Sequence, residues 1–327
     1  MPATVEQLPL FSTPPDNLPA GRPASAPAGA PSLTAASSLK AGIVAWGAHL
    51  QKEGARPNTI KSFCGDLNLF AAFAGAGRSL SQIGTRDLDK WLQAQKASGR
   101  SPKTYARRVT SLKSFFRWLE QAGILAADPA APIIQQTVLS PLPTVLTEME
   151  VEQARAAAQA LWNNPDRPDV RPYLLFTLLL QTGIKKSECL NLELNHIDVS
   201  NPEEPVLWIR YKEASNRYKE RKLRLDPSWL VIYDVYRAQY GPEQKLFPYK
   251  ARRLEYLLED ITVAAGMEKH ISFEMCRWTC AVRDARAGLE FDKIRQKLGL
   301  SKIQWREIGM KLKKLMEAGG PAATPVA

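Results

Sequence analysis

The clearest pattern in this chain lies between residues 277 and 288. Those residues read Arg277-Trp278-Thr279-Cys280-Ala281-Val282-Arg283-Asp284-Ala285-Arg286-Ala287-Gly288. We expect them to be helical, like most of the chain after Pro227. The sequence contains no tyrosine after Tyr256, and this gap bears on every functional interpretation below.

Upstream of this run, one pair of strands interrupts a helical pattern. Val206–Tyr211 and Lys222–Leu225 predict two strands joined by a charged segment over residues 212–220. An apolar helix is expected over Tyr173–Gln181, with a turn directly after it, and a capping box at Thr147–Glu150 predicts another helix. Residues 144–318 are therefore expected to form a mostly helical domain with a small antiparallel sheet, ahead of a flexible tail at 319–327.

The N-terminal half predicts a separate helical domain over residues 37–134. Apolar residues recur every three or four positions in four segments, which begin near Leu39, Asn58, Thr85 and Ser101. A proline-containing linker is expected over residues 135–143. Residues 1–36 are rich in Pro, Ala and Ser without periodic apolar positions, which predicts a disordered arm.

Charge and cysteine usage limit the class of protein. Lys and Arg number 44 against 33 Asp and Glu, and the formal charge of +11 favours a polyanionic partner through counterion release. The cysteines Cys64, Cys189, Cys276 and Cys280 contain no C-x-x-C pair and follow no secretory signal, which indicates a reducing compartment. The longest apolar stretch is too short to span a bilayer. We expect a cytoplasmic, nucleoid-associated protein with no metal, no cofactor and no membrane partner.

Several motifs, taken in order, resemble the tyrosine recombinase (phage integrase) family. In the first domain the similar runs are Asn58-Thr59-Ile60-Lys61, Ser101-Pro102-Lys103-Thr104, Leu112-Lys113-Ser114-Phe115-Phe116-Arg117-Trp118-Leu119 and Asp128-Pro129-Ala130. In the second they are Thr182-Gly183-Ile184-Lys185-Lys186-Ser187-Glu188, Leu190-Asn191-Leu192, Leu246-Phe247-Pro248 and Ala265-Gly266. The resemblance implies a mainly α, two-domain clamp around DNA, with a SAM-like core-binding domain and an integrase-type catalytic-like domain.

The same resemblance indicates that most catalytic positions have changed. Such enzymes need a tyrosine that attacks phosphorus and cationic donors that hold the two non-bridging oxygens. Arg277 is identified as the retained second arginine. The family's hairpin lysine is Lys212 or Lys219, of which Lys212 is taken as the remnant. The degenerate positions are Lys185 for the first arginine, Glu274 and Leu300 for other phosphate-binding residues, and Gly309 for the tyrosine.

Cations that fall off the apolar stripes predict contacts with phosphates. In the first domain they are Lys61, Lys103, Arg107, Arg108, Lys113 and Arg117, and in the second Lys212, Arg217, Lys219 and Arg221. The chain is therefore predicted to bind duplex DNA and to act in DNA recombination or integration as an accessory or regulatory member. Four changes in one pocket argue against autonomous strand cleavage, although enzyme activity stays open.

Alternatives stay open at the level of sequence. The chain could be an active recombinase with a non-standard nucleophile such as Ser301 or an acidic residue, or a helical protein-interaction module without a nucleic-acid role. Its expected partners are double-stranded DNA and either an active recombinase or further copies of itself on that DNA.

Overall fold

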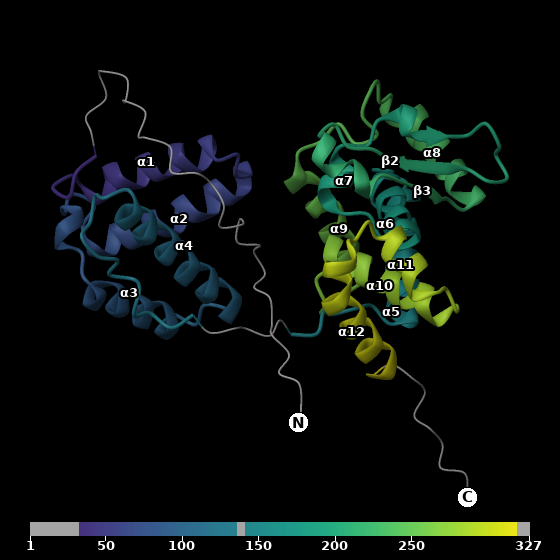
Figure 1. Cartoon of the computed structure of the whole chain (residues 1–327). Coiled ribbons are helices and arrows are strands. Elements are labelled where there is room, and N and C mark those ends of the chain that lie inside the picture. Colours follow the sequence, from purple (N-terminus) through teal and green to yellow (C-terminus); the bar gives the residue numbers. More distant parts are fainter. Residues whose placement is uncertain (1–32, 136–140, 319–327) are drawn as a thin grey trace, which may run out of the picture. The chain divides into compact units, whose positions relative to one another are not determined.

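The computed structural model describes residues 33–135 and 141–318, which divide into two compact units near residue 140 (Figure 1). The predicted tail at 319–327 lies outside the described residues, as do most of the arm at 1–36 and most of the linker at 135–143. One correction concerns the end of that arm. The carbonyl of Ala35 accepts a hydrogen bond from the amide of Ser81 at 3.0 Å, and Leu33 packs against the first core. Residues 33–36 thus belong to the first unit.

The first unit is built from four helices in the described range. They are α1 (Leu39–Lys52), α2 (Pro57–Ala74), α3 (Thr85–Ala97) and α4 (Pro102–Gln121), with a 3-10 turn at Leu80–Gln82. The hydroxyls of Ser38 and Ser101 cap α1 and α4 by accepting backbone N–H groups. The apolar stripes meet in a core around Phe70, Trp91 and Phe116, all nearly without solvent exposure. The predicted helical domain is confirmed.

The second unit surrounds one apolar helix. Its helices are α5 (Glu148–Trp162), α6 (Arg171–Thr182), α7 (Lys186–Leu190), α8 (Pro227–Tyr240), α9 (Ala251–Ala264), α10 (Phe273–Arg286), α11 (Phe291–Lys297) and α12 (Lys302–Ala318), with 3-10 turns at Leu194–His196 and Ala214–Lys219. The predicted capping box starts α5, where Thr147 and Glu150 exchange hydrogen bonds of 2.8 and 3.2 Å. Helix α6 packs against α5, α8, α9 and α10, so nearly all its side chains are buried.

A three-stranded antiparallel sheet completes the second unit in the order β1-β2-β3. The two predicted strands are confirmed as β2 (Val206–Ile209) and β3 (Arg221–Arg224), in a register that pairs Leu207 with Leu223. Strand β1 (Ile197–Asp198) was not predicted, because two residues show no alternation. In the described ranges, no helix is both long and apolar enough to cross a membrane.

Candidate phosphate-binding site

The end of α6 forms one wall of a cationic site. Gly183 ends the helix in the left-handed conformation, with φ of 59°. A Cβ at this position would lie 2.9 Å from a methyl carbon of Leu298. A side chain here would therefore meet both backbone strain and a clash. The glycine turn places Lys185, which is half-buried, at the N-terminus of α7.

Arg277 of α10 is fixed by two backbone carbonyls. Its Nη1 donates to the carbonyl of Gly183, and its Nη2 donates to the carbonyl of Leu298 at 2.5 Å. Burial lowers the pKa of Arg277 to about 10, so the guanidinium still carries its charge at neutral pH. A guanidinium has five N–H donors, which leaves donors on Arg277 for an external anion.

A buried ion pair supports this site from behind. The guanidinium of Arg221 donates to both carboxylate oxygens of Glu188, at 3.1 and 2.9 Å, and to the carbonyl of Lys297 at 2.6 Å. Tyr211 and the amide of Lys185 also donate to this carboxylate. Burial by itself would raise the pKa of Glu188, but the hydrogen bonds and charge of Arg221 outweigh it and hold the pKa at about 2.

Lys185 lies where several cations meet. Burial lowers the pKa of its ammonium to about 8, with Glu188 acting against the shift and the charges of Arg277, Lys219 and Arg221 adding to it. Burial is the main cause of this shift, and the three neighbouring cations contribute less to it. We call Lys185, Lys219 and Arg277 the cationic cluster. Its composition suits an anion with several oxygens, such as a phosphate.

The structure separates the two candidate hairpin lysines. The side chain of Lys212 is 91% exposed, and its nearest acidic partner is Glu193 at 3.9 Å. Lys219 is half-buried, donates to Asn216 at 2.8 Å, and acts electrostatically on Lys185. Lys219, and not Lys212, therefore lies in the cationic cluster of this structure, while the role of Lys212 as the catalytic remnant stays a prediction.

The other positions that the family resemblance assigns to catalysis do not add cations to the cluster. Glu274 is exposed one turn before Arg277 on α10. Leu300 is buried among apolar side chains of α10, α11 and α12. Gly309 lies inside α12, and a Cβ there would stand 3.2 Å from the indole ring of Trp305. The space next to position 309 is thus occupied by a tryptophan.

Four of the predicted DNA-contact residues are corrected by their internal partners. Arg107 and Arg108 both pair with the buried carboxylate of Asp66, at 3.0 and 3.7 Å, and Arg108 is itself buried. Lys113 donates to the carbonyls of residues 130, 131 and 133. Arg221 is committed to Glu188, as described above. The ion pairs of Arg108 and Arg221 stabilise the fold, because a buried charge without its partner is strongly unfavourable, whereas the side chain of Arg107 is 40% exposed.

Four further candidates are exposed, and their side chains have no hydrogen bond or ion pair in the described part of the chain. They are Lys61, Lys103, Arg117 and Arg217. Sequence reasoning missed the internal role of Glu188 and Arg221, which lie 33 residues apart without any local signal. Asp66 carried a signal, since it interrupts the apolar stripe of α2. Over residues 33–135 and 141–318, no group of three His, Cys, Asp or Glu side chains could hold a metal ion.

Comparison with known proteins places both units in one family. The model for the phage integrase N-terminal SAM-like domain matches residues 43–123. The model for the phage integrase family matches residues 144–308, ending one position before Gly309.

Curated relatives are similar over part of their length. Tyrosine recombinase XerC of Mycobacterium tuberculosis (strain ATCC 25177 / H37Ra) is 32% identical over 179 residues, which is 54% of this chain and 60% of that protein. XerC of Mycobacterium leprae (strain TN) is 33% identical over 146 residues, covering 44% of this chain and 49% of that protein. The chain thus matches about half to three-fifths of these relatives.

Solved structures show the same fold at low sequence identity. A lambda integrase dimer bound to a COC' core site has a TM-score of 0.66 at 13% identity, over 89% of this chain and 80% of that one. XerH recombinase in a pre-cleavage complex with difH has a TM-score of 0.60 at 19% identity, over 83% of each chain. With both domain models matched in order along it, the chain belongs to the phage integrase (tyrosine recombinase) family.

Proposed function

We propose that this protein binds duplex DNA in recombination or integration and does not cleave strands on its own. The observation that carries the proposal is position 309. The family resemblance assigns the nucleophile to this position, where the chain has a glycine that packs against Trp305, while Lys185, Lys219 and Arg277 form a cationic cluster elsewhere in the unit. Binding a phosphate requires only cations, whereas cleavage also requires an attacking group and complete charge stabilisation. A protein that binds DNA without cleaving it suits an accessory or regulatory role. It would act beside an active recombinase or as several copies on the DNA.

The solved relatives support the DNA part of this proposal. Lambda integrase is described as a dimer on a core site and as a tetramer on a Holliday junction, and XerH is described on difH DNA. Those complexes share this fold, and the chain retains exposed cations in both units.

Ser301 is a poor replacement nucleophile. Its hydroxyl accepts the backbone N–H of Gln304 at 3.2 Å, and its own N–H donates to the Gln304 side chain, so it caps α12. No cation or base contacts this hydroxyl within hydrogen-bond distance in the described residues. The alternative of an active enzyme therefore gains no support from the residue that was its first candidate.

Duplex binding should weaken steeply with salt. Each neutralised phosphate contributes a slope of about −0.9 to the plot of log affinity against log salt concentration. Replacing Lys103 and Arg117 together with glutamine should weaken binding to all sequences alike and reduce the slope by about 2. Fluorescence anisotropy with labelled duplexes measures both quantities. In the control variant, glutamine replaces Lys40, an exposed residue of the first unit, and Arg252, an exposed residue of the second unit. Equal losses in both variants, or a flat salt response, would contradict the proposed contacts.

DNA affinity should also fall with rising pH in a way that reports Lys185. Because its pKa is about 8, only about one tenth of free Lys185 is protonated at about pH 9. If the ammonium holds a phosphate, affinity should drop up to about tenfold between about pH 7 and pH 9. The Lys185→Arg variant should bind duplex DNA with the same affinity over this pH range, since an arginine keeps its charge. The idea fails if wild type and Lys185→Arg show the same pH profile.

A further inference from the structure

A second cationic site lies at the opposite end of α6 from the cationic cluster. Here the turn after α5, the start of α6 and one side of α9 enclose a pocket of about 670 Å³, which we call the arginine pocket. Arg167, Arg171 and Arg253 supply its charged side, and Leu161, Val263 and Ala264 supply an apolar side. None of these residues takes part in the phosphate-binding site.

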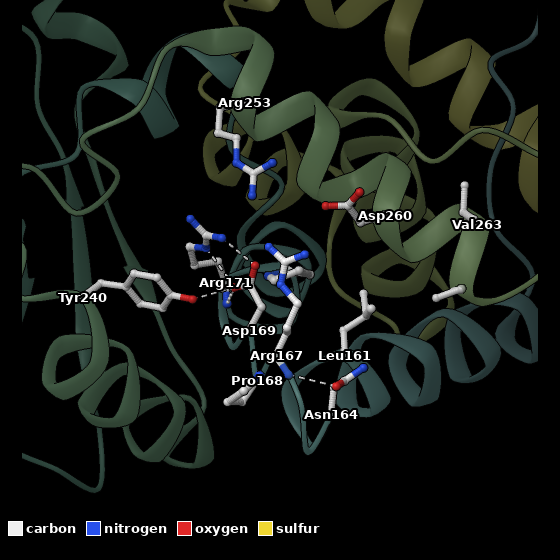
Figure 2. Close-up of a pocket in the computed structure, with 12 residues that line it drawn as sticks. Leu161, Asn164, Arg167, Pro168, Asp169, Arg171, Tyr240, Arg253, Asp260 and Val263 are labelled. Atoms are coloured by element: carbon white, nitrogen blue, oxygen red, sulfur yellow. Dashed lines mark hydrogen bonds and ion pairs between the residues drawn. The ribbon is translucent and has the colours of Figure 1, made fainter.

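One arginine of the pocket, Arg171, is held in place by an ion pair with Asp169. Arg171 donates to both oxygens of Asp169, at 2.8 and 2.6 Å, and its guanidinium lies 4.6 Å from the centre of the Tyr240 ring. The Tyr240 hydroxyl donates to the same carboxylate at 3.0 Å. Figure 2 shows Arg171, Asp169 and Tyr240 joined by these interactions. Asp169 is fully engaged by Arg171 and is not free to neutralise the other two arginines.

The remaining two arginines have no such partner. Neither Arg167 nor Arg253 has a side-chain hydrogen bond or an ion pair within 4 Å in the part of the chain that the structure describes, and both line the pocket (Figure 2). Asp260 is the other lining carboxylate, and it lies close enough to Arg253 to act on it electrostatically. Two unengaged guanidinium groups thus face one carboxylate, which leaves a net positive charge.

The backbone that carries Arg167 is held in place. The Asn164 side chain accepts the amides of Asp166 and Arg167, both at 3.0 Å. The Pro168 carbonyl accepts a hydrogen bond from the side-chain amide of Gln239 on α8 at 2.8 Å. Since the loop is anchored at both points, little ordering is needed when a ligand binds.

We propose that the arginine pocket binds a short peptide segment of a partner protein that carries both acidic and apolar side chains. Guanidinium groups accept carboxylates in a two-pronged geometry. The apolar side, where Val263 is 75% exposed, suits an aliphatic side chain. The apolar groups of duplex DNA are thymine methyls and sugar carbons, which are smaller than a leucine side chain and lie beside the phosphates or in the grooves. The 12 residues of α6, about 18 Å of helix, separate the pocket from the cationic cluster. The inference is independent of the proposed function.

The test uses the full-length chain and a labelled eight-residue peptide of alternating glutamate and leucine. Fluorescence anisotropy at low ionic strength should show saturable binding. Replacing Arg167 and Arg253 together with alanine should weaken it about tenfold. A control that replaces Arg237 and Arg252 removes the same charge from exposed positions of α8 and α9 outside the pocket, and should change binding less than about twofold. Val263→Ser should weaken the binding of the leucine-containing peptide. It should not change the binding of a peptide with serine in place of leucine.

Competition decides the source of the anionic group. Inorganic phosphate and duplex DNA should not displace the peptide, and the Arg167/Arg253 variant should bind duplex DNA as wild type does. The proposal is overturned by any of three results: no saturable binding of the peptide, equal loss in the control variant, or displacement by DNA. In the last case the pocket would be a further DNA contact.

Discussion

Replacing Glu188 with glutamine should lower the free energy of unfolding of the second unit by about 3 kcal/mol. The side chains of Glu188 and Arg221 are only 1% and 8% exposed. Removing the negative charge leaves a buried guanidinium without a partner, which is far less favourable than losing an exposed pair. Urea unfolding followed by fluorescence measures the change. The first unit contains none of these residues, so the urea concentration at which it unfolds should not change.

Two comparisons separate this effect from a general loss of charge. Glu255→Gln breaks the pair with Lys186, whose side chains are 47% and 42% exposed, and should cost less than about 1 kcal/mol. The double variant Glu188→Gln/Arg221→Met should lose less stability than the sum of the single variants, because the uncompensated charge is also removed. Equal, small effects of Glu188→Gln and Glu255→Gln would show that the buried pair is not important.

The same pair predicts a dependence of stability on pH. The pKa of Glu188 is lowered to about 2 from an ordinary value of 4.5. Its stabilising contribution is therefore complete above about pH 4.5 and is lost as the pH falls through about 2. The difference in stability between wild type and Glu188→Gln should narrow over that window, as seen in urea unfolding at successive pH values.

Much of the fold could be predicted because its signals are local. Apolar spacing at Ile60, Phe63, Leu67 and Phe70 predicted α2, and alternation predicted β2 and β3. Arg108 shows where local reasoning failed. It lies off the main apolar stripe of α4 and so seemed available to DNA, but Asp66 of α2 meets it in the core. A partner 42 residues away in sequence leaves no trace in helical periodicity.

The candidate site shows the same division. Gly183, Lys185 and Arg277 could be found through the family resemblance, since they lie in recognisable motifs. The choice between Lys212 and Lys219 could not be made from sequence, because it depends on how the segment between β2 and β3 folds. That segment contains the 3-10 turn Ala214–Lys219, which brings Lys219 near Lys185 and leaves Lys212 in solvent. The arginine pocket had no sequence signal, because its residues come from three separate segments.

The purified protein should form no covalent adduct with nicked or suicide duplex DNA, and Gly309→Tyr alone should not create this activity. A Cβ at position 309 would already stand 3.2 Å from the Trp305 ring, so the new side chain requires the indole to move. According to the family resemblance, the hydroxyl would then belong to a site with Lys185 in place of an arginine, and with Glu274 and Leu300 in place of donors. Loss of even one such donor lowers the rate by about 10² or more.

Activity should therefore return only when several changes are combined. The informative variant joins Gly309→Tyr and Trp305→Ala with Lys185→Arg, Glu274→His and Leu300→His. Leu300 is buried, so thermal unfolding must first show that this variant is folded. Its matched control carries phenylalanine at position 309, which has the same ring without the attacking hydroxyl. A slow-migrating, protease-sensitive protein–DNA band on denaturing gels should appear with tyrosine and be absent with phenylalanine. The unmodified protein has a glycine at position 309 and no tyrosine after Tyr256. The same band from that protein would therefore show that a residue elsewhere in the chain attacks phosphorus. Mapping the linked residue would then identify the nucleophile and overturn the proposal that this chain binds DNA without cutting it.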